Sequence, residues 1–299
     1  MTAVRSASGR LSAAAPRPRS LGRIGRAFQV IPLKVLISFG IVLIILVGAL
    51  VPQWFTSLDP NIPTFSARLT PPGSAAFPLG TDDLGRDLLS RVLYGARASL
   101  VIGFFATMVG LIIGSVLGLL AGYLGGMVEH VVMYLVDVQL ALPFLLLAIA
   151  IALIFGNSLP VMVMIAGLAT WPGYGRLCRG MALSLRQTDY VTAANSLGAG
   201  SLHIIVRHLL PGMMAPLLIF VTLNMGRVIL IESALSFLGI GIKPPTPSWG
   251  GMIDQGRSLL GAAWWVSTVP GAALSLLTLS IGTIGDWLRD VLDPTLSIT

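Results

Sequence analysis

The sequence predicts an all-α integral membrane protein with about six transmembrane helices. Two observations on composition lead to this fold class: 55% of the 299 residues are hydrophobic and only 10% are charged, and the mean hydropathy is +0.88. The third observation is that apolar residues gather in long runs, such as Leu33–Val51. A soluble chain carries about 25% charged residues. This chain has too few polar side chains to cover its surface in water, so lipid is its expected solvent.

Apolar runs long enough to cross the roughly 30 Å hydrocarbon core of a bilayer occur at 33–51, 99–123, 131–155, 159–178, 215–239 and 264–285. Asp137 and Pro143 interrupt the third run and Trp171-Pro172-Gly173 the fourth, but neighbouring helices can satisfy the freed backbone groups. We therefore expect five parts: a basic cytoplasmic tail at 1–30, a first transmembrane helix at 31–55, an extracytoplasmic segment at 56–96, a core of five helices at 97–286 and a C-terminal tail at 287–299.

The N-terminal tail predicts the side of the membrane on which the chain starts. No acidic residue occurs before Asp59. Six arginines precede the first apolar run: Arg5, Arg10, Arg17, Arg19, Arg23 and Arg26. Basic residues beside a span stay on the cytoplasmic side, so we expect a cytoplasmic N-terminus. The run of about nineteen residues exceeds the roughly 7–15 residues of a signal-peptide core, which favours a retained anchor over a signal or transit peptide. The same distribution accounts for the net charge of +7 without nucleic acid as a partner.

Alternation of the spans then places 179–214 inside, with 52–98 and 240–263 outside. The inside segment and its border carry one acid, Asp189, against four arginines: Arg176, Arg179, Arg186 and Arg207. The outside segment 52–98 is balanced between four arginines and four acids: Arg68, Arg86, Arg91, Arg97, Asp59, Asp82, Asp83 and Asp87. Long loops count for less in the positive-inside rule, so this assignment rests on alternation as much as on charge.

The second span contains glycines at every fourth position of GLIIGSVLGLLAGYLGG: Gly110, Gly114, Gly118 and Gly122. On a helix these glycines form one stripe without side chains, against which another backbone can pack closely. We expect static helix packing here. A gating surface between moving helices would use the same stripe.

The stretch TAANSLGAGSLHIIVRHLLP, Thr192 to Pro211, interrupts the apolar runs with polar residues and glycines. Tyr190 to Leu197 is typical of a short helix, which Asp189 can cap and which Gly198 can end in the left-handed conformation. Ser201 can cap a second short helix, whose apolar face includes Leu202, Ile205, Val206 and Leu209. We call the region Asp189–Pro211 the knuckle. Its apolar face should be buried against a partner or, alternatively, against the lipid surface.

This stretch resembles the E-A-A-x-x-x-G…P loop of permeases from bacterial binding-protein-dependent ABC importers. The pattern is matched at four positions, with Thr192 where the family usually has Glu: Ala193, Ala194, Gly198 and Pro211. In that family the first helix of the loop inserts into a groove on the ATPase subunit. The resemblance therefore implies an ATPase-coupling site that consists of Asp189, Tyr190, Thr192, Ala193, Ala194, Gly198 and Pro211.

Three further stretches resemble the C-type permeases of dipeptide, oligopeptide and nickel importers. They are PLGTDDLGRDLLSRVLYGARASL (78–100), ESALSFLGIGIKPPTPSWGGMI (232–253) and GDWLRDVLDP (285–294). Phe77 replaces the His often found before the first of them. The four motifs occur in order and cover about 78–294, which leaves the tail to about Phe28 outside the resemblance.

The resemblance implies a type I ABC importer permease fold, with a cytoplasmic coupling helix between spans 4 and 5. It also implies a bacterial inner-membrane location and three kinds of partner: a homologous permease in a heterodimer, two cytoplasmic ATPase subunits and an extracytoplasmic solute-binding protein. The chain has no G-x-x-x-x-G-K-[ST] phosphate loop, and its histidines and single cysteine lack metal-site spacing. We therefore expect a transporter subunit without catalytic residues, cofactor or metal, whose partner ATPases bind ATP and Mg²⁺.

Charged residues deep inside the predicted spans are Asp137 in the third, and Arg227 and Glu232 in the fifth. A charge at mid-bilayer costs roughly 2.5–3.5 kcal/mol on insertion scales, so each should face a partner or a wet cavity. Arg227 and Glu232 are five residues apart, about 140° around a helix, and are poor partners for each other. Arg227 either pairs with Asp137 or lines the path and meets a substrate carboxylate. Glu232 belongs to the family motif, which favours a structural role.

The expected function is therefore that of an ATP-driven importer permease for di- or oligopeptides, with nickel chelates, glutathione and haem as alternatives within the class. The rival class is an ion-gradient-driven secondary transporter, which needs titratable groups near the midplane and often has an inverted repeat. Asp137 and Glu232 supply such groups, but the sequence shows no repeat. A scaffold that only docks partners is a third alternative.

Overall fold

The computed structural model describes residues 31–292, so the predicted tail at 1–30 and the last residues, 293–299, lie outside the described part. Between residues 31 and 292 the chain forms helices and no β-strand, with one isolated bridge between Thr81 and Asp87. The predicted all-α class is confirmed.

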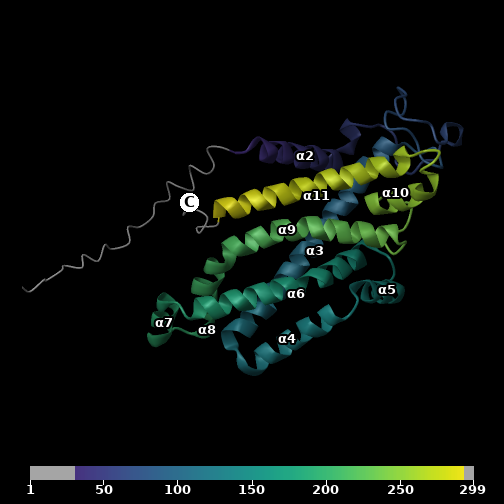
Figure 1. Cartoon of the computed structure of the whole chain (residues 1–299). Helices are drawn as coiled ribbons and strands as arrows, with labels where there is room; N and C mark the ends of the chain where they lie inside the picture. Colours follow the sequence, from purple (N-terminus) through teal and green to yellow (C-terminus); the bar gives the residue numbers. More distant parts are fainter. Residues whose placement is uncertain (1–30, 293–299) are drawn as a thin grey trace, which may run out of the picture. The chain divides into compact units, whose positions relative to one another are not determined.

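Five long helices make up the bundle: α2 (Leu33–Leu50), α3 (Leu88–Leu124), α6 (Leu159–Arg186), α9 (Leu210–Phe237) and α11 (Trp265–Leu292). Shorter helices connect them: α4 (Gly126–Ala141), α5 (Phe144–Phe155), α7 (Asp189–Ser196), α8 (Ser201–Ile204) and α10 (Trp249–Gly256). Short turns complete the described chain: η1 (Pro52–Trp54), η2 (Phe65–Ala67), η3 (Ile205–Leu209) and η4 (Arg257–Leu259). In Figure 1, α2, α11, α9 and α6 run side by side, and α7 and α8 lie at the end opposite to α10.

Within residues 31–292, four helical segments are long and apolar enough to cross a membrane: α2, α3, Ser201–Phe237 (which includes α9) and α11. The helices α4 and α5 meet the same conditions only as a pair, and that pair is bent by 92°. The 28 residues of α6 give roughly 42 Å of helix, which also exceeds the hydrocarbon thickness. Helix α6 contains Pro172 and three arginines, however, and is less apolar than the other four. The predicted count of six spans is therefore approximate.

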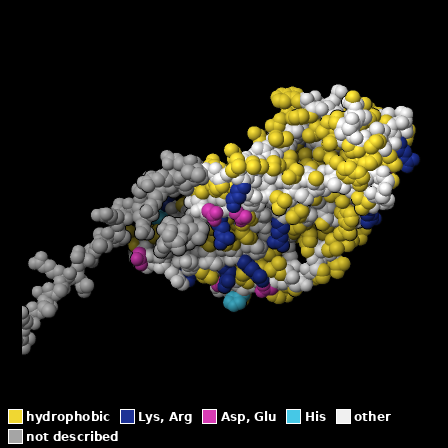
Figure 2. Space-filling view, turned by 45° about the horizontal axis from the view of Figure 1, so that its top comes forward, with side chains coloured by type: hydrophobic (Ala, Val, Ile, Leu, Met, Phe, Trp, Pro, Cys, Tyr) yellow, Lys and Arg dark blue, Asp and Glu magenta, His cyan; other side chains and the backbone are white. Residues whose placement is uncertain are grey.

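Hydrophobic side chains cover much of the surface of this bundle. Figure 2 shows one face on which yellow side chains spread over one end, while most of the charged side chains gather toward the other and a few blue ones lie at the edge of the yellow end. Large apolar residues are exposed on α2, α3, α4, α5, α9 and α11. Exposed apolar helix faces of this kind belong in lipid or against another membrane subunit.

The third predicted span, 131–155, is not one straight helix. It is divided into α4 and α5 at Leu142–Pro143, where Leu142 is extended (φ −79°, ψ 135°). Proline lacks a backbone N–H and disfavours helical geometry in the residue before it, so the helix ends there. The 12 residues of α5 span only roughly 18 Å, too short to cross a bilayer alone.

The second span begins about a dozen residues earlier than predicted, at Leu88 rather than 99. The carboxylate of Asp87 caps α3 by accepting hydrogen bonds from the backbone N–H and the hydroxyl of Ser90 (2.8 and 2.6 Å). Two arginines in the first turns have local partners, since Arg91 is buried beside Asp82 and Arg97 donates to the carbonyl of Ala49 (3.0 Å). The other end of the core also differs, because α11 continues to Leu292, into the tail predicted at 287–299.

The glycine stripe of α3 packs directly against α6. A Cβ added at Gly118 would overlap the carbonyl oxygen of Gly175 and lie 2.9 Å from its Cα. At Gly122 a Cβ would lie 2.7 Å from Cβ of Ala182. We call this contact the glycine seam, made of Gly110, Gly114, Gly118 and Gly122 with the facing surface of α6. It has the close backbone packing that the sequence predicted.

Candidate functional site

The knuckle consists of two short helices joined at a glycine. Helix α7 runs from Asp189 to Ser196, so Asp189, predicted as the cap, is instead the first helical residue. There its negative charge lies at the favourable end of the helix dipole. Gly198 has φ +82°, and its N–H donates to the carbonyl of Asn195 (3.0 Å). The predicted left-handed glycine therefore ends α7.

A few buried side chains attach the knuckle to the bundle. Val191 of α7 and Ile204 of α8 are buried. They pack in one apolar cluster with Cys178 and Ala182 of α6. This anchoring means that a force applied to α7 reaches α6 through side-chain packing rather than through a free loop.

The outer surface of the knuckle leaves apolar side chains without partners. Leu197 is 89% exposed and Leu202 is 75% exposed. The predicted apolar face of the second helix is therefore partly wrong, because Leu202 and Val206 point away from the core while Ile204 and Leu209 are buried. The π-helical turn η3 lies between α8 and α9, and one such turn shifts the phase of the side chains that follow.

The residues predicted to couple to an ATPase lie together at this end of the bundle. All are exposed except Ala194, which is half-buried: Asp189, Tyr190, Thr192, Ala193, Gly198 and Pro211. Beside them three rings form a row that the sequence did not single out, with Tyr190 6.0 Å from His208 and His208 5.9 Å from His203 between ring centroids. The knuckle is thus an exposed, preformed surface with a mixed apolar and aromatic character.

The intramembrane acid Asp137 pairs with a different arginine from the one predicted. Its carboxylate accepts a hydrogen bond from Arg176 of α6 (2.6 Å), and both side chains are more than half exposed. A second pair joins α4 and α6, in which Nε of Arg179 donates to Glu129 (2.7 Å). The predicted pair between Asp137 and Arg227 is therefore wrong. The two helices α4 and α6 run alongside each other, which brings Arg176 opposite Asp137.

Glu232 of α9 is almost completely buried, with 1% of its surface exposed. Its carboxylate accepts hydrogen bonds from three hydroxyls: Ser236 (2.7 Å), Ser99 of α3 (3.2 Å) and Ser233 (3.4 Å). These bonds join α9 to α3, in accord with the predicted structural role. Arg227, on the same helix, is exposed and makes no hydrogen bond or ion pair with the described residues.

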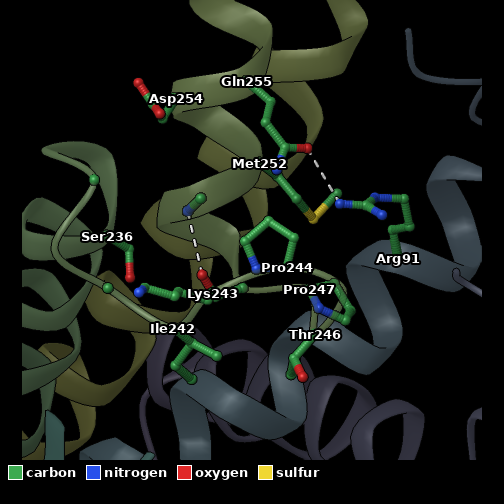
Figure 3. A pocket seen from close by; sticks show the side chains of 14 residues that line it. Arg91, Ser236, Ile242, Lys243, Pro244, Thr246, Pro247, Met252, Asp254 and Gln255 are labelled. Atoms are coloured by element: carbon green, nitrogen blue, oxygen red, sulfur yellow. Dashed lines mark hydrogen bonds between the residues drawn. The ribbon is translucent and has the colours of Figure 1, made fainter. Parts of the chain in front are cut away.

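The opposite end of the bundle carries a cationic network beside a small cavity. Asp82 accepts from Arg86 (2.7 Å) and forms an ion pair with Arg91 (3.3 Å), and all three side chains are buried. Both arginines also donate to the side chain of Gln255 (3.5 and 3.2 Å). Arg91 and Lys243 line a cavity of about 130 Å³ between the 239–248 loop and α10, as Figure 3 shows. In the sequence these residues belong to the run TDDLGRDLLSR, whose charges are typical of a solvated loop. Their burial could be recognised only in the folded chain.

The described residues contain no cluster of three His, Cys, Asp or Glu side chains placed to hold a metal ion.

Comparison with known proteins identifies one matching family and relatives that are named as transport permeases. The model of the family described as "Binding-protein-dependent transport system inner membrane component" matches residues 114–298. The di/tripeptide transport system permease protein DppC of Pseudomonas aeruginosa is 44% identical over 259 residues, which are 85% of this chain and 86% of that protein. The dipeptide transport system permease protein DppC of Escherichia coli is 43% identical over 260 residues, which are 85% of this chain and 87% of that protein.

The fold is also similar to that of a solved transporter. A chain of the MetNI methionine ABC transporter, in an inward-facing conformation, matches with a TM-score of 0.54 at 19% identity. The match covers 67% of this chain and 95% of that chain. At this level of identity the likeness concerns the fold alone.

Proposed function

Because this chain belongs to the family of binding-protein-dependent transport system inner membrane components, we propose that it forms, with a second permease, the path by which di- or oligopeptides cross the membrane. It is a multi-pass inner-membrane permease subunit of an ABC importer. The observation that carries the peptide assignment is the identity of 44% across 85% of the chain with a permease named for di- and tripeptides. Nickel chelates, glutathione and haem are less favoured because the relatives compared are named for peptides.

The knuckle is the proposed docking site for a cytoplasmic ATPase subunit. Exposed apolar side chains such as Leu197 are unfavourable in water, so a protein surface that covers them gains free energy. The buried contacts of Val191 and Ile204 with α6 make the knuckle a rigid extension of the bundle. Movement of the docked ATPase is therefore transmitted to α6 and, through the glycine seam, to α3.

ATP hydrolysis belongs to the partner subunits in this proposal. The sequence contains no phosphate loop of the G-x-x-x-x-G-K-[ST] type, so the separate ATPase subunits bind ATP and Mg²⁺. Closure of two ATPase subunits brings two knuckles together, one from each permease. A rigid-body rotation of the bundles then opens the path toward the opposite side of the membrane.

We place the knuckle on the cytoplasmic side and the segment 52–87, with α10, on the extracytoplasmic side, where the solute-binding protein docks. The arginines around the knuckle support this orientation, because Arg176, Arg179 and Arg186 flank it in α6. In a Cys178→Ser background, Ala76→Cys should react with an impermeant thiol reagent in intact spheroplasts, whereas Ser196→Cys should react only after lysis. Both residues are exposed, so the opposite labelling would show that the orientation is inverted.

The energy source distinguishes this function from its rival. We expect uptake of a labelled dipeptide such as Ala-Phe to stop when cells are depleted of ATP while the proton gradient is kept. Uptake should continue when the gradient is collapsed and ATP is maintained. The reverse result would assign the chain to the ion-gradient class, and uptake under neither condition would exclude dipeptides as substrates.

A further inference from the structure

Arg227 lies on an exposed apolar stripe of α9. Its neighbours along that stripe are Leu223, Leu230 and Ala234, which are all exposed. The spacings of four, three and four residues place these side chains on one face of the helix. The buried residues Val228 and Ile229 next to Arg227 point instead into the core of the bundle. Arg227 is thus a single cation in the middle of an outward apolar surface.

The position of Arg227 along α9 is well inside the predicted membrane region. It lies ten residues before Phe237 at the end of the 28-residue helix, which corresponds to roughly 15 Å from the nearer end. A guanidinium at such depth is unfavourable against acyl chains, so it faces a wet cavity or an anionic group.

The two acids that the sequence places inside the predicted spans are already engaged. Asp137 is paired with Arg176. Glu232 is buried on another face of α9, with its carboxylate bonded to three serines. No carboxylate of residues 31–292 forms an ion pair with Arg227, and this includes Asp286, the neighbour of Gly285, which packs against Leu223. The counter-charge is therefore sought outside the chain.

We propose that Arg227 binds the carboxylate of a peptide in transit through the path. This inference rests on the proposed peptide-permease function. Every di- or oligopeptide with a free C-terminus carries such a carboxylate, and a guanidinium recognises it with two parallel hydrogen bonds. Leu223 and Leu230, on either side, offer apolar surface for the side chains of the peptide.

The surroundings of Arg227 favour a passing substrate over a fixed partner. If the second permease is another copy of this chain, its Asp137 and Glu232 are engaged in the same way. One cation without a second charged clamp also suits a path, because a transported group must bind well enough to enter and weakly enough to leave.

The experiment measures uptake of labelled Ala-Phe by proteoliposomes that contain the complete complex and loaded binding protein. The variants are Arg227→Lys, Arg227→Gln and Arg227→Glu, and the amount of assembled complex is measured for each by co-purification of its subunits. Arg289→Gln makes the same chemical change at an exposed arginine in the last turn of α11 and serves as the control.

We expect all variants to assemble like the wild type. Uptake per complex should fall only partly in Arg227→Lys, which keeps the charge but not the two parallel hydrogen bonds. It should fall roughly tenfold or more in Arg227→Gln, as expected for losing a charge-assisted hydrogen bond in a low-dielectric site. Arg227→Glu should fall further, because it repels the carboxylate, and Arg289→Gln should match the wild type.

Three results would overturn the inference. Reduced assembly in Arg227→Gln would mean that an acid of the second permease is the partner. Normal uptake by Arg227→Gln would mean that Arg227 does not bind the substrate and that its guanidinium extends to the lipid headgroups. Equal losses in the lysine and glutamine variants would mean that charge is not what Arg227 contributes. An inactive wild-type complex would instead contradict the peptide-import function itself, so the two failures are distinguishable.

Discussion

Gly118 in the glycine seam and Gly198 in the knuckle are both required to be glycine, but for opposite reasons. At Gly118 the backbone is ordinary helix and there is no room, since an added Cβ would overlap the carbonyl of Gly175. At Gly198 no atom lies within 4 Å of an added Cβ, but φ is +82°. One glycine is needed because a neighbour is too close, and the other because the backbone bends into the left-handed region.

The two regions differ in how much of their apolar surface is covered by the chain itself. In the glycine seam, two helices of the same chain pack closely against each other. In the knuckle, Leu197 and Leu202 remain exposed although Val191 and Ile204 are buried a few residues away. A surface that is rigidly anchored on one side and apolar on the other is prepared for a partner. Substitutions in the two regions should therefore damage different properties of the complex.

The largest effect is expected in the seam. Gly118→Ala should lower the free energy of unfolding by about 1–3 kcal/mol, because the added methyl forces α3 away from Gly175. The measurement is the thermal unfolding midpoint of the complex in detergent. Gly180→Ala is the matched control on α6, since nothing lies within 4 Å of its added Cβ, and it should leave the midpoint unchanged or slightly raised. Equal midpoints for the two variants would show that the seam is loose enough to act as a moving gate.

The second effect should concern coupling rather than stability. Gly198→Val imposes a β-branched side chain on a left-handed backbone, at a local cost of about 1–2 kcal/mol, which the knuckle can relieve by changing the angle between α7 and α8. We expect normal membrane insertion and a marked loss of the ATPase activity stimulated by loaded binding protein.

The control for this prediction lies two residues away. Gly200 has φ −65° and open space around its added Cβ, so Gly200→Val tests the bulk of valine without the backbone strain. Normal stimulation in Gly198→Val would mean that the knuckle does not transmit ATPase movement. Equal losses in both variants would make bulk, and not backbone geometry, the cause.

Local features of the two regions could be predicted from sequence, and features that depend on distant residues could not. The glycine stripe follows from the spacing of residues within one helix, and the role of Gly198 follows from its place directly after one. Both are therefore visible in a short stretch of sequence. The partner of Asp137 depends on how α4 packs against α6 after the break at Pro143, which no spacing in the sequence encodes. Likewise, the sequence alone places Arg91 in a polar loop, because its partners Asp82 and Gln255 are recognised only in the folded chain. For this reason the predicted start of α3 was too late.

The smallest effect on the chain itself is expected at the exposed tip of the knuckle, and it tests whether that surface is a docking site. Leu197→Ser changes a side chain that is 89% exposed, so the unfolding midpoint of the permease should stay within the range of ordinary surface substitutions. If an ATPase subunit covers Leu197, the loss of one buried leucine should weaken binding by about 1.5–3 kcal/mol, or roughly ten- to a hundredfold in Kd. Met127, at the start of α4, is 79% exposed and lies outside the knuckle, so Met127→Ser should leave the Kd unchanged. Equal weakening by both substitutions would mean that the ATPase subunit also contacts residues outside the knuckle. No weakening by Leu197→Ser would mean that the apolar tip is not part of the contact. Because stability and affinity are measured separately, a loss of binding at constant stability can arise only from the contact.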